Sequence, residues 1–289
     1  MSSGVLELLR TLVLNPCSLA AVLVVHLLTR WQHSTWLRLL NPLELSPTWW
    51  VAGYIAVRIA LLGFVDSLCW VVGPKLPRLP TRDGQKVVYQ HKINFLDVSY
   101  LFLNSIIEFV FAQQIAFLIL ESPLILRTTR DLGVFNAAVA IWLLLVLDDM
   151  LYAPMHRLMH HPALYRWVHK HHHRNTYPAR GYVDAANEHP VEQVVALSLH
   201  WIAIHMVAHS VGLHVVALGA HFGIKALGAC FNHTGFDLQF RMLGIDYSVR
   251  AHEMHHRKPN YNFAQYVMFW DQLMGTYQPY EHGRDGRLA

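Results

Sequence analysis

The sequence is poor in charged residues. Asp, Glu, Lys and Arg make up 15% of its 289 residues, whereas about 25% is typical of soluble proteins. Hydrophobic residues account for 54%, and the mean hydropathy is +0.26. This balance favours a membrane protein. The net charge is only +4 and the basic residues are dispersed, which excludes a basic nucleic-acid-binding tract, so no nucleic acid partner is expected.

Cysteines and nucleotide-binding motifs are also scarce. Cys17, Cys69 and Cys230 each lie in or beside an apolar stretch. An odd number without paired spacing argues against a disulfide framework, so we expect buried thiols. The sequence contains no GxGxxG loop, no P-loop and no fused cytochrome b5 motif.

Long apolar stretches are present instead. A bilayer core of about 30 Å requires about 20 helical residues. A stretch at 194–230 is too long for one span and is interrupted near Gly212, which predicts a transmembrane hairpin. A cleaved signal peptide is the alternative for the first stretch, but the absence of a basic n-region and a cleavage site favours an anchor. The other predicted spans are 12–28, 49–72, 98–120 and 134–147, of which the last needs its flanks.

The loop charges predict an orientation. The loop after the second stretch is richer in basic residues than those after the first and third, which places it in the cytosol. The third and fourth stretches then cross the membrane out and back, so the residues after 147 emerge on the cytosolic side as well. We therefore predict an all-α fold, a multi-span transmembrane helical bundle with a helical cap on the cytosolic face. The basic residues of that loop are Lys75, Arg78, Arg82, Lys86 and Lys92.

Three sets of histidines carry the chemistry. Spacings of three and four place side chains on one face of a helix. Imidazole is a ligand for zinc, copper, nickel and iron. One metal takes about four to six ligands, so eight histidines predict two metals. Solvated histidines explain one such set but not three. The sets are His156 and His160; His169, His172 and His173; and His252, His255 and His256.

Other histidines need separate interpretations. His233, in "FNHTG", returns to the cytosolic face and is predicted as a ninth ligand. His189, in "NEHPVE", is either a ligand or a residue that contacts one, and the second interpretation is favoured. Asn232 is a further candidate for contact with a ligand. His161 and His171 do not follow the spacing, and their roles stay open.

Polar residues also occur inside the predicted spans. His205, His209 and His221 lie too far along the hairpin to reach the ligands, at about 1.5 Å per helical residue. We expect them to bond to another helix within the membrane. Arg58 and Glu108 lie in different apolar stretches. They are candidates for an intramembrane pair, or else lie near the membrane edge.

The histidine motifs resemble those of a known family. "HRLMHHPALYRWVHKHHH", "HPVE", "NHTG" and "HEMHH", followed by "WDQLMGTY", occur in the order found in the fatty acid hydroxylase superfamily, which includes sterol desaturases. The resemblance covers about 147–277. It divides the chain into an N-terminal transmembrane region at 1–132, a catalytic domain at 133–282 and a tail at 283–289.

The resemblance implies a membrane-bound di-iron oxygenase. Such enzymes bind two iron ions through their histidine boxes, activate O₂ and receive electrons from cytochrome b5 and its NAD(P)H reductase. The expected substrate is a sterol or another long-chain lipid, and the expected location is the endoplasmic reticulum membrane. Asp149 matches an acid common before the first box, expected to accept a hydrogen bond from a ligand imidazole. A helix-end charge facing water is the alternative for Asp149.

Several functions stay open on the sequence alone. Hydroxylation and desaturation require the same metals, and the spacing does not separate them. A histidine-rich metal transporter is the main alternative, although its ligands should lie at mid-membrane. A pseudoenzyme that binds metal without catalysis is the third possibility.

Overall fold

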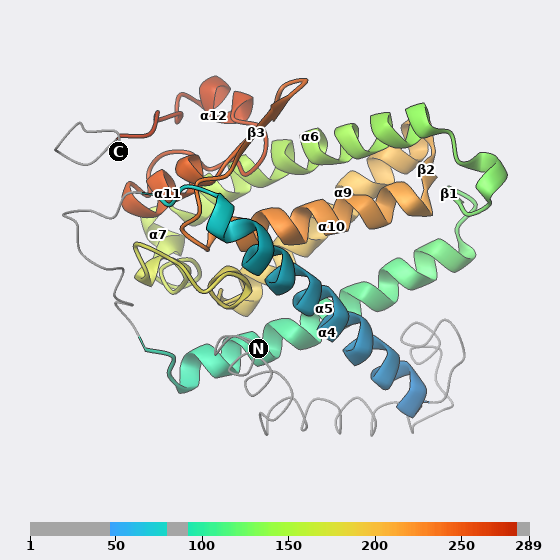
Figure 1. The fold of residues 1–289 in the computed structure, drawn as a ribbon, viewed down its shortest axis with the longest axis horizontal. Helices are drawn as coiled ribbons and strands as arrows, with labels where there is room; N and C mark the ends of the chain where they lie inside the picture. Colours follow the sequence, from blue (N-terminus) through green and yellow to red (C-terminus); the bar gives the residue numbers. More distant parts are fainter. Residues whose placement is uncertain (1–46, 80–91, 282–289) are drawn as a thin grey trace.

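The computed structural model describes residues 47–79 and 92–281, which are mostly helical (Figure 1). The predicted spans at 49–72, 98–120 and 134–147 and the predicted hairpin at 194–230 are all helices. The stretch at 12–28 lies outside the described residues. The long helices are α4 (Pro47–Val72), α5 (Phe95–Glu121), α6 (Val134–Met159), α9 (Pro190–Val211) and α10 (Val215–Asn232).

Four of these helices, α5, α6, α9 and α10, are long and apolar enough to cross a membrane. A helix satisfies its own backbone hydrogen bonds, as a segment in lipid must. The chain is thus a multi-pass membrane protein. Helix α6 continues to Met159, so one rigid element joins an apolar span to the first histidine box.

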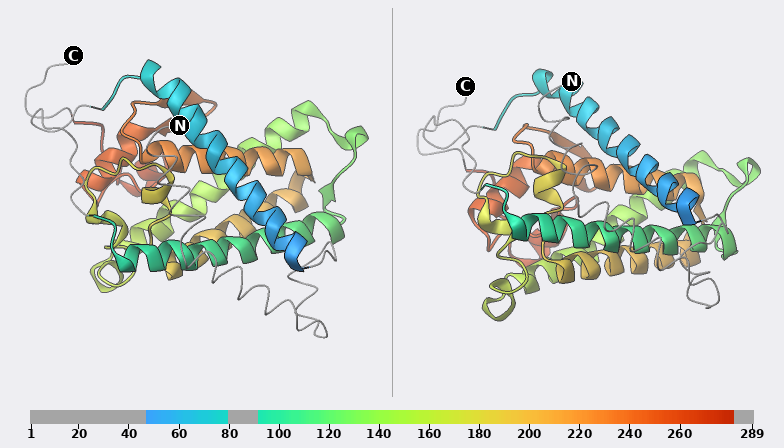
Figure 2. Two further views of the ribbon diagram at one scale, coloured as in Figure 1. Left: turned by 60° about the horizontal axis from the view of Figure 1, so that its bottom comes forward. Right: turned by 90° about the horizontal axis from the view of Figure 1, so that it is seen from below.

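Helices α6, α9 and α10 pack around a shared apolar core. Leu144, Ile204, Val207 and Leu218 are at most 1% exposed. Helix α5 packs against α9. Helix α4 crosses the bundle obliquely (Figure 2), and its Tyr54 ring meets the Phe109 ring of α5 edge-on, with centroids 4.6 Å apart.

The helical hairpin turns where the sequence predicts. Gly212 ends α9 with φ +75°, a conformation that costs a side-chain-bearing residue free energy. Beyond it, β2 (Leu213–His214) pairs in parallel with β1 (Ile125–Leu126). This turn joins the ends of the bundle that lie away from the histidine motifs, so α10 carries the chain back towards them.

A cap of short elements covers the opposite end of the bundle (Figure 1). The indole nitrogen of Trp142 on α6 donates to the Leu243 carbonyl at the tip of the cap's β-hairpin. The cap comprises α7 (Pro162–Tyr165), η4 (His172–Arg174), α8 (Tyr182–Ala185), β3 (Gln239–Met242), β4 (Ile245–Ser248), α11 (Val249–Arg257) and α12 (Phe269–Met274). Two further short turns are η1 (Gly73–Lys75) and η3 (Thr129–Asp131).

Candidate metal centre

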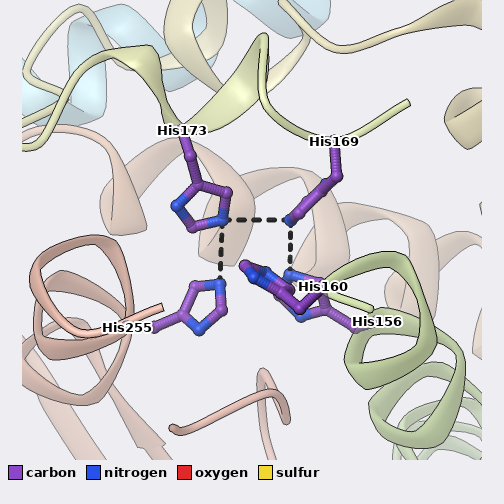
Figure 3. Close-up of side chains that lie close together, drawn as sticks. All are labelled: His156, His160, His169, His173 and His255. Carbon is purple, nitrogen blue, oxygen red and sulfur yellow. Dashed lines mark hydrogen bonds between the residues drawn. The ribbon is translucent and has the colours of Figure 1, made fainter. Parts of the chain in front are cut away.

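Five histidines form a first cluster at the junction of bundle and cap (Figure 3). One ring nitrogen from each lies within 4.8 Å of the corresponding nitrogens of the others. The Nε2 atom of His169 lies 3.0 Å from those of His156 and His173, and His173 Nε2 lies 3.0 Å from His255 Nε2. His160 completes this five-histidine cluster, its ring centroid 4.5 Å from that of His169.

Four more histidines form a second cluster with the same spacing of ring nitrogens, within 4.8 Å of one another. His252 Nε2 lies 3.1 Å from His256 Nε2 and 3.3 Å from His233 Nε2. His172 Nε2 lies 3.5 Å from that of His233. The two clusters adjoin, because the rings of His173 and His256 have centroids only 4.6 Å apart. Both clusters are able to bind a metal.

The local backbone explains how the second and third boxes supply both clusters. We predicted that all three boxes are presented by helices, and this is wrong for the second. The segment at 169–173 is an irregular turn that ends in η4. His169 and His173 enter the five-histidine cluster, while His172 enters the four-histidine cluster.

The third box divides in the opposite way along α11. His252 and His256, four residues apart on one face, enter the four-histidine cluster, and His255 enters the other. All nine histidines predicted as ligands therefore lie in the two clusters. That they bind metal stays a prediction.

Backbone carbonyls orient several of the rings. His156 Nδ1 lies 2.8 Å from the Phe263 carbonyl, and His255 Nδ1 lies 2.7 Å from the Tyr261 carbonyl. In the four-histidine cluster, His233 Nδ1 lies 2.7 Å from the Ala229 carbonyl. A ring that donates from Nδ1 keeps the Nε2 lone pair for a metal. The loop after α11 therefore fixes rings that come from two different helices.

Asp149 contacts the loop after α11 and does not contact a ligand ring. It is fully buried, and its carboxylate accepts the backbone N–H groups of Gln265, Tyr266 and Val267 at 2.7–2.9 Å. The predicted hydrogen bond from a ligand imidazole to Asp149 is therefore wrong. The alternative, a helix-end charge that faces water, is wrong as well. Asp149 therefore acts on His156 only indirectly, through the loop that carries Phe263.

Asp271 secures the same loop from the other side. Its carboxylate accepts the N–H groups of Phe263 and Ala264 at 2.8 Å and the Thr276 hydroxyl at 2.7 Å. Both Asp271 and Thr276 belong to the "WDQLMGTY" motif. This motif thus orders the carbonyl that contacts His156.

One acid beside the clusters was missed in the sequence. Glu192, near the start of α9, places Oε1 2.6 Å from His169 Nδ1, and both side chains are almost completely buried. The "HPVE" motif was the available signal, but the sequence interpretation considered only its histidine. That residue, His189, instead caps α9 by accepting the Val191 N–H and packs against Tyr100.

The remaining predicted residues lie outside the clusters. His171 Nε2 lies 3.0 Å from both the Asn187 side-chain oxygen and Asp97 of α5, which tethers the turn at 169–173 to that helix. His161 caps α7 by accepting the Ala163 N–H. Asn232 is buried, and its Oδ1 has no hydrogen-bond partner among the described residues.

Burial keeps the imidazoles uncharged. Desolvation lowers the pKa of His160 to about 2, and the neighbouring His156 ring adds to this effect. Desolvation, reinforced by neighbouring imidazoles, also holds the pKa of His169, His172 and His252 well below the ordinary value. Neutral rings are the form that binds a metal, so the clusters are in the ligating state at neutral pH.

A layer of charged groups lies below the clusters, inside the bundle. Asp148 on α6 is fully buried, 2.7 Å from Lys225 Nζ on α10 and 2.5 Å from His200 Nδ1 on α9. His221 is completely buried, and neither ring nitrogen has a partner among the described residues. Asp148 precedes His156 by eight residues, about 12 Å along the helix.

The expected pair between α4 and α5 is also present. Arg58 lies 2.9 Å from the Glu108 carboxylate and donates to the Tyr182 hydroxyl at 2.7 Å. Tyr182 itself donates to Glu108 at 3.0 Å. His205 and His209, which we expected to bond to another helix, stack on each other along α9, outside both clusters.

Comparison with known families decides the affiliation of this part of the chain. Residues 140–276 match the family described as Fatty acid hydroxylase. This segment belongs to the fatty acid hydroxylase family. It runs from α6 to the Thr276 that binds Asp271, so it contains both histidine clusters, Asp149 and Glu192. Membership in the fatty acid hydroxylase family implies a di-iron oxidoreductase that acts on a lipid with O₂. No solved structure matches the chain.

Proposed function

We propose that the chain is a membrane-bound non-haem di-iron oxygenase. It hydroxylates, or otherwise oxidises or desaturates, a sterol or long-chain lipid, using O₂ and external electrons. The observation that carries this proposal is the pair of adjoining clusters, of five and four buried or half-buried histidines, at one end of the candidate membrane spans. The family match of residues 140–276 supports the same reaction class.

The donor set fits two iron ions. Imidazole nitrogens bind iron, and nine of them divide into two sets of a size that a single ion accepts. Zinc binds such rings equally well but has no redox change to offer. When bound, two iron ions would supply O₂ activation and the oxidising power needed to attack an unactivated C–H bond.

The protein's own residues prepare the site. The carbonyls of Tyr261, Phe263 and Ala229 hold Nδ1 of three rings, which leaves Nε2 free to bind metal. Because these rings are locked by buried contacts, the ligands are preorganised before metal arrives. The apolar packing of Phe263 and Met268, both at most 3% exposed, keeps bulk water from this side.

The position of the clusters suggests how a lipid reaches them. They lie where the candidate spans meet the cap, so a lipid can enter sideways from the bilayer without crossing water. Ligands at the helix ends also argue against the metal-transporter alternative, which requires ligands at mid-membrane.

The proposed setting follows the sequence predictions. The site faces the cytosol from the endoplasmic reticulum membrane, where cytochrome b5 and its NAD(P)H reductase supply electrons. The catalytic domain spans 133–282, preceded by the transmembrane region at 1–132 and followed by a tail at 283–289. Labelling a His161→Cys variant with a membrane-impermeant maleimide in sealed microsomes tests the orientation. Protection from reagent added on the cytosolic side contradicts it.

Purification followed by metal analysis and turnover tests the function. The protein, loaded with iron and supplied with cytochrome b5, its reductase, NADPH and O₂, is incubated with extracted membrane lipids. We expect two irons per chain and a new hydroxylated or unsaturated product. The His172→Ala variant should lose turnover while remaining in the membrane, whereas His161→Ala should keep it. Iron-loaded protein that binds two metals but consumes no O₂ with any lipid fraction contradicts the enzyme and favours a metal-binding role.

A further inference from the structure

The two histidine clusters differ in their outer contacts. Among the described residues, His169 is the one cluster histidine whose ring contacts a carboxylate, Glu192. The rings of His156, His255 and His233 contact backbone carbonyls instead. Nδ1 of His172, His173 and His256 has no hydrogen-bond partner among these residues. Among the described residues, a direct contact with an acidic side chain therefore occurs in the five-histidine cluster alone.

The geometry of His169 makes the role of this contact specific. Its Nδ1 lies 2.6 Å from Glu192 Oε1, and its Nε2 lies 3.0 Å from the Nε2 atoms of both His156 and His173. One nitrogen thus faces the acid while the other faces the middle of the cluster. A carboxylate that accepts the Nδ1 proton fixes the tautomer and makes Nε2 a stronger donor to metal.

The burial of the pair strengthens the effect. The His169 and Glu192 side chains are 1% and 3% exposed, so little solvent screens their interaction. Glu192 lies in the first turn of α9, so its side chain projects from a rigid element. A carboxylate on a rigid helix also fixes a ring that comes from an irregular turn.

We infer that Glu192 is a positioning residue that acts through His169 and makes the two metal sites unequal. The five-histidine cluster, with its extra ring and the Glu192 side chain that orients His169, holds its ion more tightly. The four-histidine cluster, with fewer ligands and no such acid among the described residues, holds its ion less tightly. This inference rests on the proposed function, because it assumes that both clusters are loaded with iron.

Two substitutions separate the acidity of the Glu192 side chain from its ability to orient the ring. Glu192→Gln keeps a side-chain oxygen that can accept the Nδ1 proton but replaces the carboxyl group by a neutral amide. Glu192→Ala removes both. Glu121→Gln is the control, because Glu121 is an exposed acid at the end of α5 and, among the described residues, no hydrogen bond or ion pair joins it to a cluster histidine.

The experiment measures bound metal and its spectrum. Each purified full-length variant is loaded with ⁵⁷Fe, dialysed against a chelator, and examined by elemental analysis and Mössbauer spectroscopy. For the wild type and Glu121→Gln we expect two irons with distinct signals, one of which is lost to the chelator first. For Glu192→Gln, the signal of the more tightly held iron should shift, and its retention should fall about 10- to 100-fold. For Glu192→Ala, the stoichiometry should fall towards one.

The possible failures are distinguishable. Wild-type protein that binds no iron contradicts the proposed function and this inference with it. Two irons in the wild type with unchanged retention and spectrum in Glu192→Gln contradict only the role of Glu192. Should Glu192→Ala fail to fold, the Glu192→Gln spectrum still decides, because a purely structural role would not shift the signal of one iron alone.

Discussion

His172 and His173 are neighbours in the chain, yet their rings enter different clusters. Nε2 of His172 lies 3.5 Å from His233, whereas Nε2 of His173 lies 3.0 Å from His255. The segment at 169–173 is an irregular turn and not a regular α-helix. In such a turn, neighbouring side chains can point in different directions, and this makes the division possible.

The first prediction follows from this division. His172→Ala and His173→Ala should each lower the iron content from two towards one, but at different sites, and each should reduce turnover more than about 100-fold. Mössbauer spectra of the two ⁵⁷Fe-loaded variants should lose different signals. The control is His161→Ala, which removes a ring outside both clusters. Loss of the same signal in both variants would refute the assignment.

The second prediction concerns Asp149 and the loop after α11. Asp149→Ala leaves three backbone N–H groups without their acceptor, at about 1–3 kcal/mol each. We expect the free energy of unfolding to fall by at least about 3 kcal/mol and iron retention to weaken, because the loop also carries the Phe263 carbonyl. Unfolding in detergent micelles measures the first effect and chelator competition the second.

Two comparison variants sharpen the test of Asp149. Asp149→Asn keeps one side-chain acceptor, so its loss of stability should be smaller than that of Asp149→Ala. Glu121→Gln changes an exposed acid at the end of α5 and should leave stability within about 0.5 kcal/mol. Equal stability of Asp149→Ala and the wild type would show that the loop does not depend on this carboxylate.

Local signals were enough to predict the spans and the nine cluster histidines. Apolar length marks α5 and α6, Gly212 marks the turn of the hairpin, and the spacing of His252 and His256 fits one face of α11. Each of these signals depends on residues close together in the chain, so a single sequence contains it.

Contacts between distant segments were not predictable in the same way. Glu192 is 23 residues from His169, and their contact depends on how α9 packs beside the turn. Asp149 contacts backbone N–H groups more than a hundred residues away. Because nearly every residue has such a group, the sequence does not indicate which of them a carboxylate contacts. The Arg58–Glu108 pair could be predicted from the sequence, because charged residues are rare in apolar stretches and have few possible partners.

The third prediction tests the charged layer inside the bundle. Among the described residues, Lys225→Met leaves the buried Asp148 with His200 as its one charged-group partner. Breaking such a buried pair costs about 3–5 kcal/mol. The double variant Asp148→Asn, Lys225→Met should be more stable than Lys225→Met alone, because it removes the unpaired charge. The free energies of unfolding of the wild type, both single variants and the double variant complete a double-mutant cycle. Additive effects would mean that the two side chains do not interact.

The last prediction is the pH dependence of the metal-free protein. Its cluster histidines have pKa values lowered by burial, to about 2 for His160. Below the ordinary pKa of about 6.5, the unfolded chain binds more protons than the folded one, so stability falls as the pH drops. Burial raises the pKa of Glu188 to about 8 and of Glu253 to about 7. These two carboxyls act in the opposite sense.

The histidines outnumber these two acids, so the free energy of unfolding of the metal-free protein should increase with pH. The histidines outside the spans with lowered pKa are His160, His169, His171, His172, His173, His189, His233, His252, His255 and His256. We expect the midpoint of thermal unfolding to decrease steadily from pH 7 to pH 5. The His160→Gln variant should lower the slope by up to about 1.4 kcal/mol per pH unit, the contribution of one proton. A midpoint that rises on acidification would contradict neutral, buried rings.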